Sequence, residues 1–215
     1  MNDVATQLIP REPSQPGLED AIEFVNTTGV RRGRPFDDVD TVDRLLGWLV
    51  QSGYLAPAAA AAEHTRLGHG SVAGQQAMGV LRAARAGLRD LIDAAVEERT
   101  PRPDAVEAVN GVLRLPERAE LVTVGERLRV AYLREGAPLD QALASIARAI
   151  AAEISEGRRD RFRICDNAEC RWAFYDRSRP GSRRWCEMAS CGNRMKAARH
   201  RARLRGTGGA APDVG

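Results

Sequence analysis

The sequence predicts a mainly α-helical protein in which a helical N-terminal domain with one β-hairpin precedes a small cysteine-rich module. Three observations lead to this fold class. Apolar residues recur at helical spacing through most of residues 17–157. One stretch, residues 121–132, alternates instead with the period of a strand. All four cysteines lie in the 27 residues from Cys165 to Cys191.

Composition limits the class of protein. The chain has 215 residues, 43% of them apolar and 28% charged, which suits one or two folded domains. No apolar run approaches the roughly 18 residues of a membrane span, and no apolar run follows a basic cluster near the N-terminus. We therefore expect a cytoplasmic protein without a membrane segment. In a reducing compartment, clustered thiols indicate metal or redox chemistry more often than disulfides.

The first elements follow from local signals. We expect a flexible leader over residues 1–16, a short helix over 17–28 and a basic loop over 29–35. Residues 42–50 place their apolar side chains on one helical face. Asp38 or Asp40 can cap this helix, and Gly53 stands where a C′ residue belongs.

Proline and glycine mark the later elements. Pro57 opens an alanine-rich helix that ends near Gly68, and Ser71 can cap a long helix reaching residue 95. Glycines at 74, 79 and 87 weaken this long helix by about 1 kcal/mol each relative to alanine. Pro103 opens the next helix, a hairpin turns at Gly125, and a last long helix runs from 138 to 157.

The cysteines form two C-x4-C pairs separated by fifteen residues. This pattern predicts one structural Zn²⁺ held by Cys165, Cys170, Cys186 and Cys191, with sulfur atoms at about 2.3 Å and no open coordination position. Between the pairs, residues 172–175 read as an aromatic strand, 176–181 as a turn and 184–185 as the return, so we expect a hairpin there. A helix follows Cys191. The order resembles a treble clef, over a module spanning residues 158–205.

The aromatic side chains of this module have two interpretations. Trp172, Phe174, Tyr175 and Trp185 are four of the chain's ten aromatic residues. A segment of under 50 residues needs a metal and a few large side chains to hold it together. We expect the aromatics to form this small core, and stacking on nucleic-acid bases is the alternative.

Positive charge is concentrated in the same module. Residues 158–205 hold 15 basic and 5 acidic residues, a net charge of +10, and the remainder of the chain carries −7. This asymmetry favours a nucleic-acid partner, and a solvated basic tail is the alternative. In the helix after Cys191, we expect Arg194, Arg201 and Arg205 on one face and Lys196, Arg199 and Arg203 on the neighbouring face. The candidate nucleic-acid contacts are Arg183, Arg184, Arg194, Lys196, Arg199, Arg201 and Arg203. Arg194 could instead neutralise the zinc–thiolate centre.

The run from Cys186 through Cys191, Gly192, Asn193 and Arg194, with Cys165 and Cys170 upstream, resembles the CGNR zinc-finger family. Two short strings, Glu23–Thr27 and Leu46–Leu49, are similar to the ABATE domain that precedes this finger in bacterial proteins. The resemblance implies a stress-linked bacterial transcription regulator whose finger binds DNA. Our first hypothesis is therefore a two-part regulator in which the helical domain over 17–157 senses a signal or mediates assembly and the zinc module binds DNA.

Other interpretations stay open. The zinc module could serve an adaptor that binds protein or RNA, or a thiol switch in which oxidation ejects zinc. Asn26 and Arg32 could line a small ligand pocket, and a homodimer is a further alternative. We expect no enzyme, because the sequence has no phosphate-binding glycine loop, no H-E-x-x-H and no G-x-S-x-G. We expect a disordered tail over residues 206–215.

Overall fold

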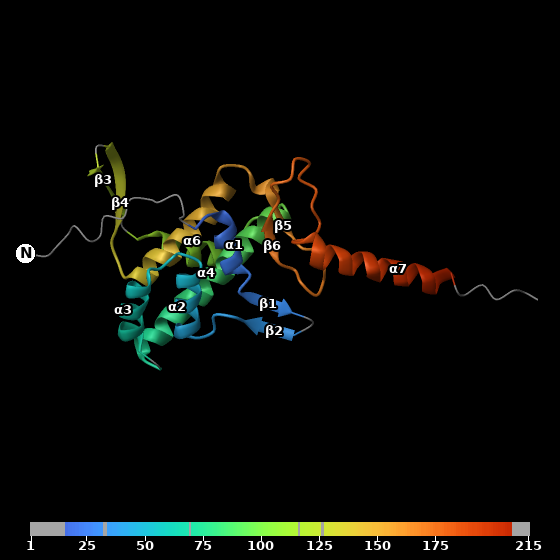
Figure 1. The fold of residues 1–215 in the computed structure, drawn as a ribbon, viewed down its shortest axis with the longest axis horizontal. Helices are drawn as coiled ribbons and strands as arrows, with labels where there is room; N and C mark the ends of the chain where they lie inside the picture. Colours follow the sequence, from blue (N-terminus) through green and yellow to red (C-terminus); the bar gives the residue numbers. More distant parts are fainter. Residues whose placement is uncertain (1–15, 32–33, 69, 116, 126, 208–215) are drawn as a thin grey trace, which may run out of the picture.

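The computed structural model describes residues 16–31, 34–68, 70–115, 117–125 and 127–207. Within these ranges the chain forms seven α-helices and three two-stranded antiparallel sheets (Figure 1). Their bounds are α1 Leu18–Val25, β1 Thr28–Arg31, β2 Arg34–Asp37, α2 Val42–Gln51, α3 Pro57–Leu67, α4 Val72–Val96, α5 Pro103–Leu113, β3 Glu117–Val124, β4 Arg127–Arg134, α6 Pro138–Ser155, β5 Phe162–Ile164, β6 Ala173–Tyr175 and α7 Asn193–Thr207.

Helix α4 is the centre of the helical domain. It packs against α1, α3, α5 and α6, and also against β5 of the cysteine module. Its side chains Leu81, Leu88 and Ile92 are buried together with Ile146 and Ile150 of α6. The mainly helical class is thus confirmed, with its core between α1, α4 and α6.

The long helix α4 runs for 25 residues in spite of its glycines. Two of them are required by packing. A Cβ on Gly74 would lie 2.7 Å from the carbonyl oxygen of Leu67, and a Cβ on Gly87 would lie 2.7 Å from that of Ala105. Glycine therefore allows the backbone of α4 to approach two neighbouring segments, which offsets its weak helix propensity.

The caps of the first long helices agree only in part with the sequence prediction. Ser71 caps α4, and its Oγ accepts a hydrogen bond from the N–H of Gly74 at 2.9 Å. Gly53 has a φ of 74°, as a C′ residue requires. The cap of α2 is Thr41, however, whose Oγ1 accepts from the N–H of Arg44. The prediction of Asp38 or Asp40 was wrong, because Thr41 is the residue directly before the helix.

The basic loop predicted over residues 29–35 is instead the hairpin β1–β2. Thr28 pairs with Asp37, and Val30 with Pro35. A buried arginine of α4 fixes the base of this hairpin: Arg85 donates to Oγ1 of Thr27 at 2.9 Å and to both carboxylate oxygens of Asp37 at 2.9 and 2.5 Å. The helical domain therefore has two hairpins where one was expected.

The second hairpin, β3–β4, is the one that the alternating pattern predicted. It is longer than expected, pairing Glu117 with Arg134 and Val124 with Arg127. It stands off one end of the molecule, and α7 extends from the opposite end (Figure 1). Leu121 and Leu128 are 72% and 71% exposed on it.

The cysteine module shares the core of the helical domain. Phe162, Ile164 and Ala173 of the β5–β6 hairpin are buried in the same cluster as the leucines of α4. Strand β5 lies against α4, and β6 lies against α1. The boundary expected between residues 157 and 158 therefore separates two segments of sequence that are packed together in space.

The predicted leader and tail fall largely outside the described residues. Of the tail expected from residue 206, residues 206 and 207 are the last turn of α7. No helix in the described part of the chain is both long and apolar enough to cross a membrane.

Candidate metal centre and basic helix

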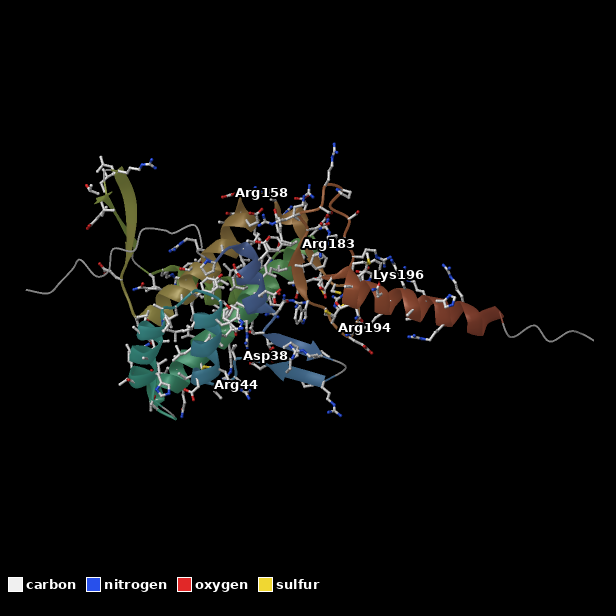
Figure 2. All side chains as sticks on the ribbon, in the orientation of Figure 1. Asp38, Arg44, Arg158, Arg183, Arg194 and Lys196 are labelled. Atoms are coloured by element: carbon white, nitrogen blue, oxygen red, sulfur yellow. The ribbon has the colours of Figure 1, made fainter. Side chains whose placement is uncertain are left out.

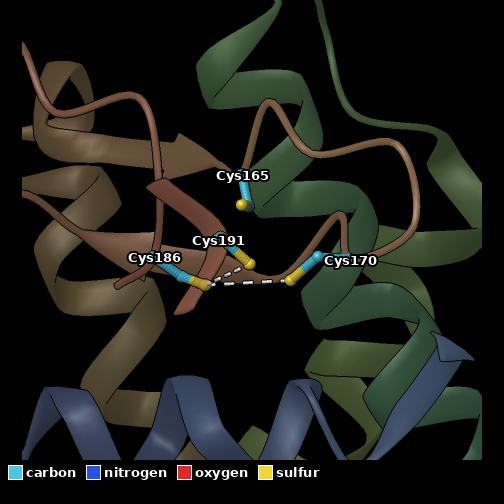
Figure 3. Close-up of side chains that lie close together, drawn as sticks. All are labelled: Cys165, Cys170, Cys186 and Cys191. Atoms are coloured by element: carbon cyan, nitrogen blue, oxygen red, sulfur yellow. Dashed lines mark hydrogen bonds between the residues drawn. The ribbon is translucent and has the colours of Figure 1, made fainter. Parts of the chain in front are cut away.

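The four cysteine sulfurs converge on one point (Figure 3). Cys165 directly follows β5, Cys170 precedes β6, Cys186 lies in the irregular segment after β6, and Cys191 lies in the wide helical turn Met188–Gly192 that leads into α7. All four sulfur atoms are within 4.8 Å of one another.

The spacing of the sulfurs fits a zinc ion. Four sulfurs at about 2.3 Å from a tetrahedral centre stand about 3.8 Å from each other. The Sγ atoms of Cys170 and Cys186 are 3.7 Å apart, and those of Cys186 and Cys191 are 3.8 Å apart. The four cysteines therefore hold one structural Zn²⁺, which links the β5–β6 loop, packed in the shared core, to the segment that leads into α7.

The hairpin of this module differs from the predicted one. Strand β6 pairs with the preceding strand β5, in the register Phe162–Tyr175 and Ile164–Ala173. The prediction had paired it with residues 184–185, which follow it. The N–H of Cys165 continues the ladder by donating to the carbonyl of Trp172 at 2.8 Å. The loop that carries the first two ligands is therefore the hairpin turn itself, and residues 176–187 cross to the second pair without strand pairing.

Without a cation, burial opposes the ionisation of these closely spaced thiols. Burial raises the pKa of Cys170 to about 11, and the nearby sulfur of Cys165 adds to this effect. Burial also raises the pKa of Cys186 well above its usual range. Burial opposes ionisation of Cys191 too, but hydrogen bonds from Asn167 and the other thiols lower its pKa. A dication offsets this repulsion and releases the protons that the thiols would otherwise keep.

Asn167 is a functional residue that sequence reasoning missed. Its side chain is 4% exposed, and its Nδ2 donates to Sγ of Cys191 at 3.5 Å. Its Oδ1 accepts from the N–H of Glu169 at 3.1 Å, which fixes the first ligand loop. The only signal was its place inside a C-x4-C loop, where an asparagine commonly shapes a turn.

Two of the four aromatic residues form the small core that we expected. Phe174 and Trp185 pack on the cysteines. A Cβ on Gly192 would lie 3.5 Å from the Trp185 ring and would overlap Sδ of Met188, so the glycine leaves room for this core. Tyr175 contacts Phe162 edge-on at 5.4 Å and donates to Oε1 of Glu153 at 2.5 Å, which ties the module to α6.

Helix α7 begins at the metal centre and carries no acidic residue. Its side chains Arg194, Lys196, Arg199, Arg201 and Arg203 are exposed, and Figure 2 shows Arg194 and Lys196 at its first turn. The two sets of basic residues do not lie on neighbouring faces as predicted. At about 100° per residue, Arg194 and Arg201 lie opposite Lys196, Arg199 and Arg203. The helix therefore carries positive charge on two opposite faces.

Two other predicted nucleic-acid contacts are bound within the module. The guanidinium of Arg184 donates to Asp166 at 2.6 Å. That of Arg183 donates to the carbonyl of Cys186 at 2.5 Å and lies 5.0 Å from the Phe174 ring centre. Both residues remain exposed, so they add positive charge to the surface while holding the ligand segment.

The pocket expected around Asn26 and Arg32 is not formed by Asn26. Its Nδ2 donates to the carbonyl of Ala173, its Oδ1 accepts from the N–H of Ala173, and both distances are 2.9 Å. Asn26 is 3% exposed, so its amide is a buried clamp between α1 and β6. Arg32 lies outside the described residues.

Comparison with known families covers nearly all of the described chain. Residues 20–157 match the ABATE family, described as "Putative stress-induced transcription regulator". Residues 161–204 match the CGNR zinc finger. A search of curated proteins found no match to the chain. The two matches stand in the order that the sequence predicted, and neither description is that of an enzyme.

Proposed function

The chain belongs to the ABATE family of putative stress-induced transcription regulators, and we propose that it binds duplex DNA through helix α7. The observation that carries this proposal is the surface of α7. A fifteen-residue helix with six arginine or lysine residues and no acidic one extends from a zinc-held base into solvent. A helix of this diameter fits the major groove, and arginines on both sides of it reach the phosphates of the two strands.

The metal centre would set the direction of α7. Cys191 lies two residues before the start of α7, and the β5–β6 hairpin that carries Cys165 and Cys170 is packed in the core of the ABATE domain. The zinc ion would connect these two parts. A regulator of this design acts in the bacterial cytoplasm. Its helical domain senses a signal or mediates assembly, and its zinc finger binds DNA.

Two pairs of substitutions on opposite faces of α7 test the proposal. Arg194→Ala with Arg201→Ala and Arg199→Ala with Arg203→Ala each remove two charges. Arg44→Ala with Arg114→Ala removes the same charge from exposed ion pairs of the helical domain. We expect at least one α7 pair to weaken duplex binding about tenfold or more and to reduce the log–log salt slope by about 2. The control pair should change affinity by less than about twofold, since its arginines belong to α2 and to the end of α5 and are paired with Asp40 and Glu107.

Zinc content separates this result from unfolding. All three variants should keep one equivalent of zinc, because none of the six residues is a ligand. Unchanged affinity in both α7 pairs would contradict the proposal. It would favour the second candidate, a zinc-stabilised adaptor for protein or RNA, which the same basic surface also suits.

Assembly of the helical domain is proposed through the β3–β4 hairpin. Leu121 and Leu128 belong to adjacent cross-strand pairs of one face, and both are exposed. An isolated two-stranded hairpin is only marginally stable in water, so a second copy of the hairpin covering this face would stabilise both. Sedimentation of the wild type and of Leu121→Ser with Leu128→Ser tests this. A dimer that the substitutions leave intact would contradict it.

A further inference from the structure

A cavity adjoins the metal centre. Its volume is about 940 Å³, within the range of small-molecule sites, and it is open to solvent between α1, the β1–β2 hairpin and the zinc module. Cys170, Cys186 and Cys191 line it, whereas Cys165 does not. Three of the four zinc ligands can therefore meet a small molecule from this side.

The four sulfurs differ in how well they are shielded. Cys165 is fully buried and Cys191 is 5% exposed, but Cys170 and Cys186 are only partly buried. Cys191 also accepts the hydrogen bond from Asn167. In the described part of the chain, no N–H group donates to Sγ of Cys186, whose hydrogen-bond partners are sulfur atoms. Hydrogen bonds and burial both reduce the reactivity of a zinc-bound thiolate. With zinc bound, Cys186 would therefore combine partial exposure with the fewest hydrogen bonds to its sulfur.

The walls of the cavity indicate the kind of molecule that enters. Val30, Trp172 and Phe174 supply apolar and aromatic surface. Three arginines and three glutamates also line it, so the formal charges of the lining balance: Arg31, Arg34, Arg194, Glu23, Glu169 and Glu187. Aromatic walls and a balanced charge suit a flat uncharged ring. Arg34 and Arg194, which form no ion pair among the described residues, can stabilise an oxygen that becomes negative as the ring reacts.

We propose that Cys186 is a modification site for uncharged α,β-unsaturated carbonyl compounds of the quinone class, which bind in this cavity. The sulfur lone pair forms a bond to a ring carbon, and the π electrons of the attacked double bond move to the carbonyl oxygen. That oxygen takes one proton from solvent. The attacked ring carbon then loses its proton to solvent while the second carbonyl oxygen takes one, which gives an aromatic hydroquinone thioether. No group other than this proton leaves and no further oxidant is needed, because the quinone itself accepts the two electrons.

The adduct would weaken the metal centre. A thioether is neutral and donates more weakly to zinc than a thiolate does, so the ion loses one of its four anionic ligands. Cys191 and the first turn of α7 would then lose part of their support. The modification itself does not depend on DNA binding; only its regulatory consequence rests on the proposed function.

The test uses the zinc-loaded full chain and 1,4-benzoquinone. Peptide mapping by mass spectrometry after limited reaction should find the adduct at Cys186 about tenfold more often than at Cys165. A chromogenic indicator should register zinc release at the same rate. The rate of adduct formation should rise in proportion to the concentration of benzoquinone. Even labelling of all four cysteines, or a rate that does not depend on benzoquinone, would overturn the proposal, since both mean that zinc leaves first.

Two variants separate the cavity from simple exposure. Val30→Trp narrows the cavity and should slow the reaction, while Val80→Trp, at a valine of similar exposure on α4, should not. Cys186→His keeps a fourth zinc ligand and should abolish the fast adduct while retaining zinc. A full rate in Val30→Trp would show that the cavity plays no part. No DNA enters these assays, so their failure would leave the proposal for α7 unaffected.

Discussion

Replacing Asn26 by alanine removes the clamp between the ABATE domain and the zinc finger. The amide of Asn26 makes two hydrogen bonds of 2.9 Å to the backbone of Ala173, 147 residues away in sequence. Alanine leaves the N–H and the carbonyl of Ala173 buried without these partners. The finger would then be attached mainly through Phe162, Ile164 and the Tyr175–Glu153 hydrogen bond.

The magnitude follows from these two bonds. Each hydrogen bond stabilises the folded state by about 1 kcal/mol net, and a buried polar group left without a partner costs about 1–3 kcal/mol. We therefore expect Asn26→Ala to lower the free energy of unfolding by about 2–4 kcal/mol. Gln75→Ala is the matched control, because that amide is exposed and makes one bond of 3.3 Å to Gly70. Its effect should stay within about 0.5 kcal/mol.

Urea unfolding at constant zinc, followed by circular dichroism and tryptophan fluorescence, measures both changes. The two probes report different parts of the chain, because α4 dominates the helical signal and two of the three tryptophans lie in the finger. In Asn26→Ala, a fluorescence transition at a lower urea concentration than the circular dichroism transition would show that the finger detaches first. A change of less than about 0.5 kcal/mol in Asn26→Ala would refute the clamp.

Three further predictions concern buried polar groups. Arg85→Ala leaves Asp37 without its paired cation and should lower the free energy of unfolding by about 2–4 kcal/mol, measured by urea titration. Asn167→Ala removes the donor to Cys191 and should weaken zinc binding about 10- to 100-fold in competition with a chelating dye. Burial opposes ionisation of Asp90, but hydrogen bonds from Arg99 and from the N–H of Arg102 lower its pKa. Its contribution to stability is therefore complete above the unfolded value of about 3.9 and is lost as the pH falls through the lower folded value. Unfolding free energies at pH 6 and pH 3 check this, and Asp90→Asn should reduce the difference between them.

Features that depend on neighbouring residues were predictable from the sequence. The apolar stripes of α2, α4 and α6, the alternation of β3–β4 and the two C-x4-C pairs each act over a few residues or one loop. The local sequence determines each of them, through helical periodicity, strand alternation or ligand spacing. The spacing of the cysteines predicted the cluster of four thiols that the structure brings together.

Features that depend on distant residues were not predictable in the same way. Hairpin β1–β2 looked like a basic loop because its fixing residue, Arg85, lies 48 residues after Asp37. The pairing of β6 with β5 was missed because either partner strand could close a hairpin with residues 172–175. The role of Asn26 depends on Ala173, whose backbone carries no side-chain signal at all. In each case the deciding contact joins segments that no periodicity relates.

The central claim is that zinc holds a basic helix in position to bind DNA. A salt titration of duplex binding by fluorescence anisotropy, on the full chain with its zinc quantified, tests this claim most directly, with a chelator-treated sample beside it. If about six phosphates are contacted, the log–log slope should be about −5, and demetallation should abolish the binding. Absence of binding at about 50 mM salt with zinc fully occupied, or equal binding by both samples, would contradict the claim.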